Sequence, residues 1–412
     1  MLRILHTADW HLGHTLHGLS REYEHTRFLA WLQDMLEDQQ ADALIIAGDI
    51  FDSANPPASA QALFYRFIAE AKARCPRLAI IAIGGNHDSA ARLDAPRPLY
   101  AAIGAQVLGA LPRSANGAID AERVANPLAD RTGRIAAWCA AIPFLRPLDV
   151  HREDADGADP QQAIQQVYAD AIAAAAARRE PGQALIAVGH CHVAGGEPSR
   201  LSERRILRGD QEALPAAMFP AVVGYAALGH LHLAQAVGGQ AHIRYSGSPI
   251  PLSLAERAYR HQVVCVDIDA GAVREIRALA IPRSVEMLCL PEQGPLPLAE
   301  VLERLRRLEL TAEPNSERQP LLEVRVLLDR PEPGLRPRID AVLADKPVRL
   351  VKISPHYPGS AASLADSLPR IDLRTLGHDD VFRRRYQQVH GGEPAPELLA
   401  AFRELTMDAE LG

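Results

Sequence analysis

Short apolar runs alternate with helical repeats in the first part of the chain. Two stretches, 22–39 and 58–74, repeat their apolar residues at helical spacing. They separate three runs with the length and apolar content of buried strands, LRILHTAD, DALIIAGD and LAIIAIGGNHD. This βαβαβ order predicts a largely parallel sheet covered on both faces, and functional groups in such a sheet gather at the carboxyl ends of its strands.

The next part of the chain predicts a second sheet. A Pro- and Gly-punctuated stretch at about 109–133 is expected to be loop-rich, and an Ala-rich helix is expected at 160–179. The strand candidates are RIAAWCAAIPF, ALIAVGHCH, YAALGHLH, AHIRYSGSPI and HQVVCVDID. Because the last three follow one another without a helical pattern between them, we expect a more antiparallel second sheet, and an α/β sandwich of two sheets with helices outside.

The character of the sequence changes near residue 282. From there SVEMLCL, LLEVRVLLD and VRLVKI alternate with helical patterns at 298–308 and 335–343, which predicts a small, separate α/β domain. The predicted units are 1–281, 282–354 and a linker with a helical tail, 355–412.

Two amphipathic helices are expected in the tail, at 379–389 and 396–407. The second helix carries an apolar stripe of Leu398, Leu399, Phe402 and Leu405. Either this stripe packs on the chain's own domain or it docks on a partner protein.

Composition and charge narrow the class of protein. Among 412 residues no run approaches the ~18 apolar residues of a membrane span, and the opening MLRILHTADW has no secretory pattern, so we expect a cytoplasmic protein. The five cysteines lie far apart without a CxxC pair, which indicates reduced thiols rather than a thiolate zinc site. A net charge of −7 argues against a protein that coats polyanions, although bound cations make a metal site locally positive.

Five short motifs with metal-ligand side chains come at the ends of strand candidates. Each alone is a weak signal, since a turn glycine beside a capping aspartate or a hydrogen-bonded histidine has the same letters. Together they contain the side chains of a two-metal site. The motifs are DWH (Asp9, His11), GDIFD (Asp49, Asp52), GNHD (Asn86, His87, Asp88), GHCH (His190, His192) and GHLH (His230, His232).

The ligand types indicate which ions fit and what they do. Two divalent ions about 3.5–4 Å apart need a bridging ligand, and Asp49 is the candidate because one carboxylate can bind both. Asp9 and His11 can then hold one ion and Asn86 the other, with the two histidines of GHLH diverging to different ions. Mixed imidazole, carboxylate and amide ligands suit Mn or Fe better than a structural zinc. Two such cations against two carboxylates leave a net charge of about +2, which attracts a phosphodiester and lowers the pKa of a bridging water, so that a hydroxide can attack phosphorus.

His87 adjoins a candidate ligand without being needed as one. We therefore expect it to face the substrate and to stabilise or protonate the departing oxygen, with Asp88 orienting the ring and raising its pKa. The alternative role for Asp88 is structural, as the N-cap of a helix that begins in SAARLDA.

The set DxH, GDxFD, GNHD, GH and GHxH resembles the signature of the calcineurin-like metallophosphoesterases. The stretches HTADWHLG, GDIFDSANPP, YAALGHLH and YSGSPIPLS are similar to the SbcD-like branch of that superfamily, which belongs with the MRN-type nucleases. The resemblance covers nearly the whole chain and implies a catalytic His87 and two divalent ions. It places around one ion Asp9, His11, Asp49 and His232, and around the other Asp49, Asn86, His190 and His230.

The same resemblance implies a substrate and partners. The small domain resembles a capping domain that contacts DNA, and the terminal helices resemble a segment that grips the coiled coil of an SbcC-like SMC-type ATPase. Two copies of the chain are expected to pair within a heterotetramer. Three residues stay without an assigned role: Asp52, where several relatives carry histidine, Cys191 and His192.

The predicted function is a metal-dependent DNA nuclease, with Mn²⁺ favoured, that acts as an exonuclease on double-stranded DNA and an endonuclease on single-stranded or hairpin DNA. Its expected roles are DNA repair, recombination and replication. A stand-alone phosphatase or cyclic-nucleotide phosphodiesterase is the alternative, but such an enzyme has little use for residues 283–412. A non-catalytic scaffold predicts missing ligands, and none is missing from the motifs.

Overall fold

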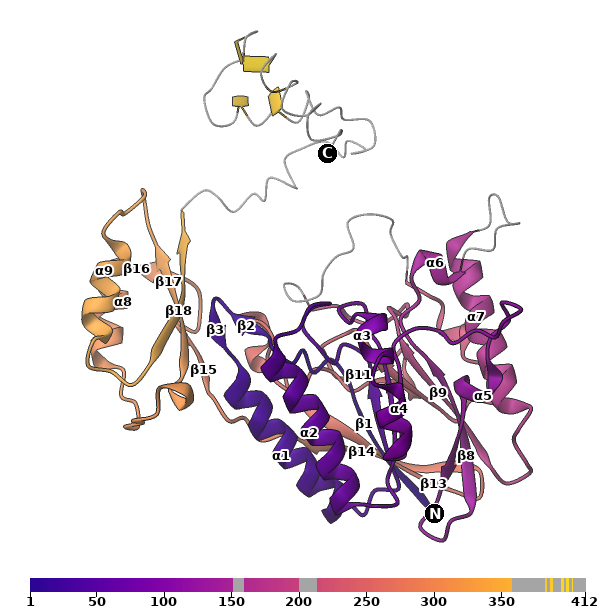
Figure 1. Ribbon diagram of the computed structural model, residues 1–412. Helices are drawn as coiled ribbons and strands as arrows, with labels where there is room; N and C mark the ends of the chain where they lie inside the picture. The colour runs from indigo at the N-terminus through magenta and orange to yellow at the C-terminus, as the bar shows by residue number, and fades with distance from the viewer. Residues whose placement is uncertain are drawn as a thin grey trace.

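Two six-stranded sheets lie face to face in the larger part of the molecule, and a four-stranded sheet lies beside them (Figure 1). The structure, a computed structural model, describes residues 1–150, 159–199 and 213–357, and nearer the C-terminus 382–383, 386–387, 394–395, 398–399 and 402. The predicted α/β sandwich of two sheets with helices outside is confirmed, and a smaller α/β unit follows it.

The first sheet contains the predicted βαβαβ opening. Its strands and the helices between them are β1 (Leu2–Thr7), α1 (Glu22–Asp38), β4 (Ala43–Ala47), α2 (Ala58–Arg74), β5 (Ala79–Ile83), β6 (Ala105–Leu108), β13 (Gln262–Asp269) and β14 (Ala272–Ala280). The strand order is β14-β13-β1-β4-β5-β6. Strands β1, β4, β5 and β6 run parallel because helices carry the chain back between them, and β13 and β14 extend the sheet in antiparallel fashion.

The second sheet corrects one expectation. It consists of β7 (Ala125–Ala129), β8 (Ile135–Ile142), β9 (Ala184–His190), β10 (Tyr225–Gly229), β11 (Gln235–Val237) and β12 (Gln240–Tyr245), in the order β11-β12-β10-β9-β8-β7. The prediction of a more antiparallel sheet is wrong, because β8, β9, β10 and β12 are parallel and only the edge strands β7 and β11 are antiparallel. Helix α7 (Pro160–Ala176) returns the chain between β8 and β9, and the edge strand β11 returns it between β10 and β12, so no helix is needed there. The segment HQVVCVDID lies in the first sheet, as β13, and not in the second.

Three apolar layers stabilise the sandwich. On the outer face of the first sheet, α1 and α2 bury Phe28 and Phe64 among many other apolar side chains. Between the two sheets lies a layer of small and β-branched residues that includes Ile45 and Val188. On the outer face of the second sheet, α7 buries Tyr168. With the sheet faces covered in this way, the strand ends are where polar side chains can meet a substrate.

The shorter elements lie mostly in the connections. The stretch 109–133, expected to be loop-rich, also contains a short helix and the edge strand β7, which tolerates Pro127 because an edge strand need not donate on its outer side. The short elements are β2 (Thr15–Leu16), β3 (Leu19–Ser20), α3 (Ala90–Asp94), α4 (Arg97–Ala102), α5 (Ala121–Val124), α6 (Pro147–Val150), η1 (Ala216–Met218), η2 (Leu254–Ala258) and η3 (Ser316–Arg318).

The C-terminal α/β unit has the predicted β-α-β-α-β order. Its elements are β15 (Met287–Leu290), β16 (Leu296–Pro297), α8 (Leu298–Arg307), β17 (Leu321–Leu327), α9 (Leu335–Leu343) and β18 (Arg349–His356). Strand β17 is central, with β18 along its length and β15 and β16 pairing successive parts of it, all in parallel. Val301, Val324 and Ile339 belong to a core of its own, and a small cluster that includes Leu16 and Met287 joins this unit to the sandwich.

The tail is described at only a few positions. Leu399 is buried and Leu398 is 47% exposed, while the Phe402 ring stacks on Phe382 with 4.3 Å between the ring centroids. This stacking joins the two segments predicted as tail helices. Leu405 lies outside the described residues, and docking of the stripe on a partner stays a prediction. No helix in the described part of the chain has both the length and the apolar character needed to cross a membrane.

Candidate metal centre

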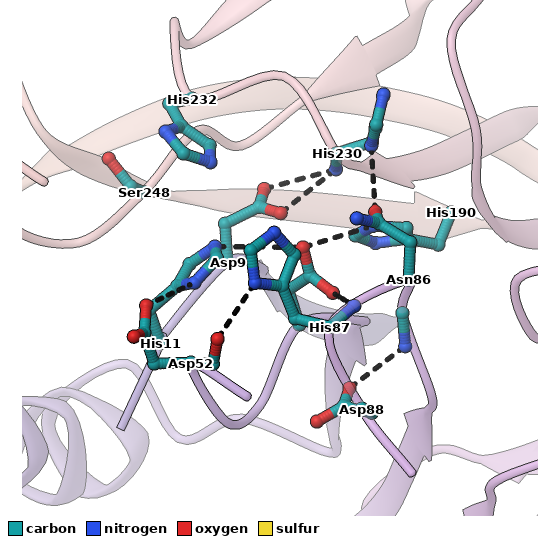
Figure 2. Close-up of polar contacts among 12 residues, drawn as sticks. Asp9, His11, Asp52, Asn86, His87, Asp88, His190, His230, His232 and Ser248 are labelled. Carbon is teal, nitrogen blue, oxygen red and sulfur yellow. Dashed lines mark hydrogen bonds and ion pairs between the residues drawn. The ribbon is translucent and has the colours of Figure 1, made fainter. Parts of the chain in front are cut away.

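The five motifs converge at one edge of the sandwich, where strands of both sheets end (Figure 2). Asp9 and Asp49 closely follow β1 and β4, and Asn86 closely follows β5. His190 is the last residue of β9, and His230 comes directly after β10. The carboxyl ends of parallel strands meet at the same edge, so the sequence order of the motifs becomes a spatial cluster.

The backbone at this edge is left-handed at several residues that carry a Cβ. Asp9, His11 and Asp49 have φ angles of 54°, 47° and 48°, a region that costs free energy for any residue except glycine. The two turns hold each other in place: the Asp9 N–H donates to Gly48 O at 3.0 Å, and the His11 N–H donates to Asp49 O at 3.0 Å. Such strain, kept by cross-bonded turns, is typical of a functional site.

Two glycines leave the space that the side chains occupy. A Cβ on Gly85 would lie 2.1 Å from Asp49 Oδ1, and a Cβ on Gly48 would lie 2.2 Å from His190 Nδ1. Neither distance is possible for real atoms. The glycines of GDIFD and GNHD therefore serve the packing of the ligand side chains as well as the turns.

One group of possible ligands consists of Asp9, His11 and His232. Each of the three offers a ligand atom within 4.8 Å of the other two. Among the described residues, His11 Nε2 is buried without a hydrogen-bond partner, and it lies 3.6 Å from Asp49 Oδ2. A buried nitrogen without a partner is costly in an apolar setting, and a metal ion would satisfy its lone pair.

A second group gathers around Asn86. Its Oδ1 atom lies 2.9 Å from His190 Nε2 and 3.0 Å from His230 Nδ1. Asp49 Oδ2 lies 3.4 Å from the same His190 nitrogen. The single Asp49 oxygen thus lies near a histidine of each group, where a bridging ligand belongs.

Burial and charge at this edge favour a cation. Burial raises the pKa of Asp9 to about 7, against the opposing effect of His190 and His232. Burial alone would lower the pKa of His190, but the carboxylate of Asp49 raises it to about 9. For Asp49 itself, burial is outweighed by His190 and other histidines, so its pKa lies well below the usual value. These carboxylates need positive charge close by, and the oxygen and nitrogen donors present fit divalent metal ions.

His87 and Asp88 do not interact in the predicted way. Both Asp88 oxygens accept backbone N–H groups, from Gly85 and Ile50 at 2.8 and 3.0 Å and from Phe51 at 2.9 Å. Figure 2 shows the Asp88 carboxylate pointing away from the His87 ring. The prediction that Asp88 orients His87 is therefore wrong.

Asp88 does not cap a helix either, since α3 has Ser89 at its N-cap. Its carboxylate instead ties the GNHD loop to the GDIFD loop, because it accepts from the backbone of both. The His87 ring is held by Asp52 through its backbone carbonyl, which lies 2.8 Å from Nδ1. The His87 N–H donates to Asp49 Oδ1 at 2.8 Å, so the loop and the candidate bridge are linked.

Sequence reasoning missed Glu256 and left Asp52 without a role. His232 Nδ1 lies 3.1 Å from Glu256 Oε1, and His11 Nδ1 lies 3.1 Å from Asp52 Oδ1. Glu256 is fully buried. Its signal in the sequence is only a glutamate shortly after the apolar stretch SPIPLSL, and nothing there pairs it with a histidine over twenty residues earlier.

Two other residues near the site have different positions. The Cys191 sulfur accepts from the Tyr168 hydroxyl inside the apolar layer under α7, so it faces away from the ligands. His192 lies near His230, with ring centroids 6.5 Å apart, and is half-buried. Arg146, which the sequence did not single out, donates from Nη2 to the carbonyl of Asp88 at 2.7 Å and so supports the GNHD loop.

Two family models match the chain. Residues 2–234 match the family of calcineurin-like phosphoesterases, and residues 283–390 match the family described as the Type 5 capsule protein repressor C-terminal domain. The crystal structure of Pseudomonas putida nuclease MPE covers 45% of this chain and 61% of its own at 18% identity, but its TM-score of 0.19 is too low to support an argument.

Three curated proteins, each named as the D component of the nuclease SbcCD, are similar to the chain. The protein from Rhodobacter capsulatus is 43% identical and covers 88% of this chain and 90% of its own length. The one from Escherichia coli K12 is 34% identical over 93% and 92% of the two chains, and the one from Bacillus subtilis is 35% identical over 66% and 67%. The chain therefore belongs to the calcineurin-like phosphoesterases and, within them, to the metal-dependent nucleases of the SbcD family.

Proposed function

We propose that the chain hydrolyses phosphodiester bonds in DNA, from the ends of double strands and within single-stranded or hairpin DNA, with two Mn²⁺ ions bound. The observation that carries the proposal is the position of Asp49 Oδ2 between His11 Nε2 and His190 Nε2, at 3.6 and 3.4 Å. When bound there, two divalent ions would supply the charge that attracts a phosphodiester and acidifies water. Mn²⁺ is the proposed ion because the donors are imidazole, carboxylate and amide, without a thiolate.

The protein's own contribution to catalysis is assigned to His87. Its Nδ1 donates to the carbonyl of Asp52, which orients the ring, and Nε2 of the doubly protonated ring is then the atom that can pass a proton to the departing oxygen. The ring is half-buried and lies beside His11, with ring centroids 4.7 Å apart. Asp88 acts through the backbone, because it fixes the loop that carries His87.

We also propose that the chain works with an SbcC-like ATPase, as two copies of each in a heterotetramer, on cytoplasmic DNA. The support is the name of the relatives, each of which is one component of an SbcCD nuclease. The proposed division of labour assigns cleavage to residues 1–281, DNA contact to 282–354 and ATPase binding to the tail. The stripe residue Leu398 is 47% exposed and is therefore available for such a contact.

The experiment compares His87→Gln with His242→Gln, a half-buried histidine of β12 that is not among the site residues. Cleavage of single-stranded and double-stranded DNA is measured with Mn²⁺, and metal uptake is measured by calorimetry. His87→Gln should reduce cleavage by about 10²–10⁴-fold with unchanged Mn²⁺ binding, because it removes a proton donor and no ligand. His242→Gln should match the unchanged chain.

Two outcomes contradict the proposal. Cleavage by His87→Gln at the rate of the unchanged chain removes the catalytic role of His87. Rapid hydrolysis of a small phosphate ester, with none of DNA in the presence or absence of the ATPase, replaces the nuclease proposal with the phosphatase alternative.

A further inference from the structure

The histidines of the candidate centre differ in what holds their outer ring nitrogen. His11 and His232, which belong to one ligand group with Asp9, both face a carboxylate with that nitrogen. The distances are the same, 3.1 Å from His11 Nδ1 to Asp52 Oδ1 and 3.1 Å from His232 Nδ1 to Glu256 Oε1.

The other two histidines differ from this pair. His190 Nδ1 donates to the backbone carbonyl of Ala47 at 2.9 Å, and His230 directs its Nδ1 toward Asn86 Oδ1, a candidate ligand of the same ion, at 3.0 Å. Within residues 1–150, 159–199 and 213–357, no carboxylate hydrogen-bonds to His190 Nδ1 or to the ring of His230. The carboxylates behind the ligands are thus confined to the Asp9 group.

The carboxylate of Glu256 is held in one position by the residues around it. It is fully buried in the 3₁₀ helix η2, and its Oε2 accepts the Leu252 N–H at 2.8 Å. The Ser248 hydroxyl lies 3.5 Å from the same oxygen. One carboxylate oxygen is therefore occupied by the loop, while the other faces His232, so the imidazole is held in a single orientation.

The chemistry of the two arrangements differs. A histidine that donates Nδ1–H to a carboxylate keeps Nε2 unprotonated and becomes a stronger electron donor at that atom. The added negative charge also attracts a cation over a short distance in a poorly hydrated site. A backbone carbonyl fixes the tautomer equally well but carries no net charge, so it gives less of this second effect.

We propose that Asp52 and Glu256 are positioning residues that make the Asp9–His11–His232 position bind its divalent ion more tightly than the Asn86–His190–His230 position. The inference rests on the proposed function, because it requires that both positions bind a divalent ion. The two ions then bind in a fixed order, with the ion beside Asp9 first. The more weakly held ion is then the one at the position that contains Asn86, and the His87 ring lies on the side of the tighter position, beside His11.

The test is a calorimetric titration of the metal-free full chain with Mn²⁺, which reports affinity without catalysis. The unchanged chain should take up two ions in two separate steps. Glu256→Gln and Asp52→Asn keep the shape of the side chains but remove the charge, and each should weaken the first step by about 10- to 100-fold with little change in the second. Glu286→Gln, an exposed glutamate outside the site, is the matched control and should change neither step.

Two ligand variants assign the steps. His230→Ala should remove the weaker step, and His232→Ala should remove the tighter one. The melting temperature of each variant is also measured without metal. A change in the metal-free melting temperature reports an effect on folding, so a variant that melts like the unchanged chain but binds Mn²⁺ more weakly has lost metal affinity alone. If Glu256→Gln does not fold, Asp52→Asn at the half-exposed position decides the question.

Equal affinities in the unchanged chain overturn the inference, and so do variants whose first step is unaltered. Both results leave the proposed nuclease intact. Conversely, two unequal Mn²⁺ steps without any DNA cleavage support the inference and contradict the proposed function, so the two can fail separately.

Discussion

The two-sheet sandwich and the C-terminal α/β unit differ in how they treat polar groups. At one edge of the sandwich, carboxylates and imidazoles such as Asp9, Asp49 and His190 are buried side by side. In the C-terminal unit, Glu323 is the one buried charged side chain among the described residues from 282 to 357. The same contrast holds for the backbone, because the left-handed residues with a Cβ in the described chain all lie in the sandwich.

The contrast separates stabilising parts of the fold from a part that opposes folding. Buried carboxylates and left-handed backbone both cost free energy, and the layers of apolar residues around the sandwich must offset that cost. The C-terminal unit, with its apolar core under α8 and α9, carries little of this cost, since Glu323 is its one buried carboxylate among the described residues. A fold usually keeps strain of this kind only where function requires it.

The largest expected effect comes from filling the space beside Asp49. Gly85→Ala puts a Cβ where Asp49 Oδ1 and the Asp49 backbone N lie, at 2.1 and 2.3 Å, so the candidate bridge must move. A shift of about 1 Å in a catalytic group can cost about 10²-fold in rate, and we expect at least that loss in DNA cleavage together with weaker Mn²⁺ binding.

The matched control for this change lies in the other region. Gly334→Ala, just before α9, meets its nearest atom at 3.5 Å and needs no left-handed backbone, so cleavage and stability should be nearly unchanged. Equal activity of the two alanine variants would contradict the placement of Asp49 at the centre of the site.

A core substitution in the C-terminal unit should have the opposite signature. Leu305 is fully buried between α8 and the sheet, so Leu305→Ala should lower the free energy of unfolding by about 2–5 kcal/mol. Mn²⁺ affinity should stay the same, because the metal ligands belong to the other core. Chemical denaturation and calorimetry measure the two quantities, and Leu99→Ala, at a leucine that is 70% exposed, is the control. A large loss of metal affinity in Leu305→Ala would show that the two regions are coupled.

The sequence predicted most elements because their apolar spacing reflects burial. The helix expected at 58–74 has those bounds in the structure, as does the one expected at 335–343, since in both the apolar stripe ends where the core ends. Strand direction in the second sheet was predicted wrongly because a pattern of apolar residues records which faces are buried and not which way the chain returns. The edge strand β11, three residues long, makes that return and has almost no pattern of its own.

The candidate ligands were predictable because each stands in a short motif at a strand end. The partners behind them were not. Asp88 accepts N–H groups from residues 37 and 38 positions earlier, and Glu256 meets a histidine 24 positions earlier. Such pairs are set by how two turns or a strand and a 3₁₀ helix are brought together in space, and no local spacing encodes them.

The smallest effect concerns a buried histidine that contacts both sheets. His6 lies in β1, and its Nδ1 and Nε2 atoms contact the Tyr225 hydroxyl and the Leu228 carbonyl of β10 at 2.9 and 3.2 Å. Burial lowers its pKa to about 3. Between that value and the ordinary pKa of about 6.5, the unfolded chain binds a proton that the folded chain does not, so stability should fall as pH falls through this range.

His6→Gln isolates this contribution. In the presence of a chelator, denaturation at about pH 7.5 and about pH 5.5 should show that the unchanged chain loses about 1.4 kcal/mol more on acidification than the variant does. The exposed His17 provides the control, and His17→Gln should keep the full pH dependence. An identical loss in His6→Gln and the unchanged chain would mean that His6 takes up its proton without unfolding. The interface between the sheets would then accommodate the positive charge of a protonated His6. Buried charge would no longer distinguish the edge with the carboxylates from the rest of the sandwich.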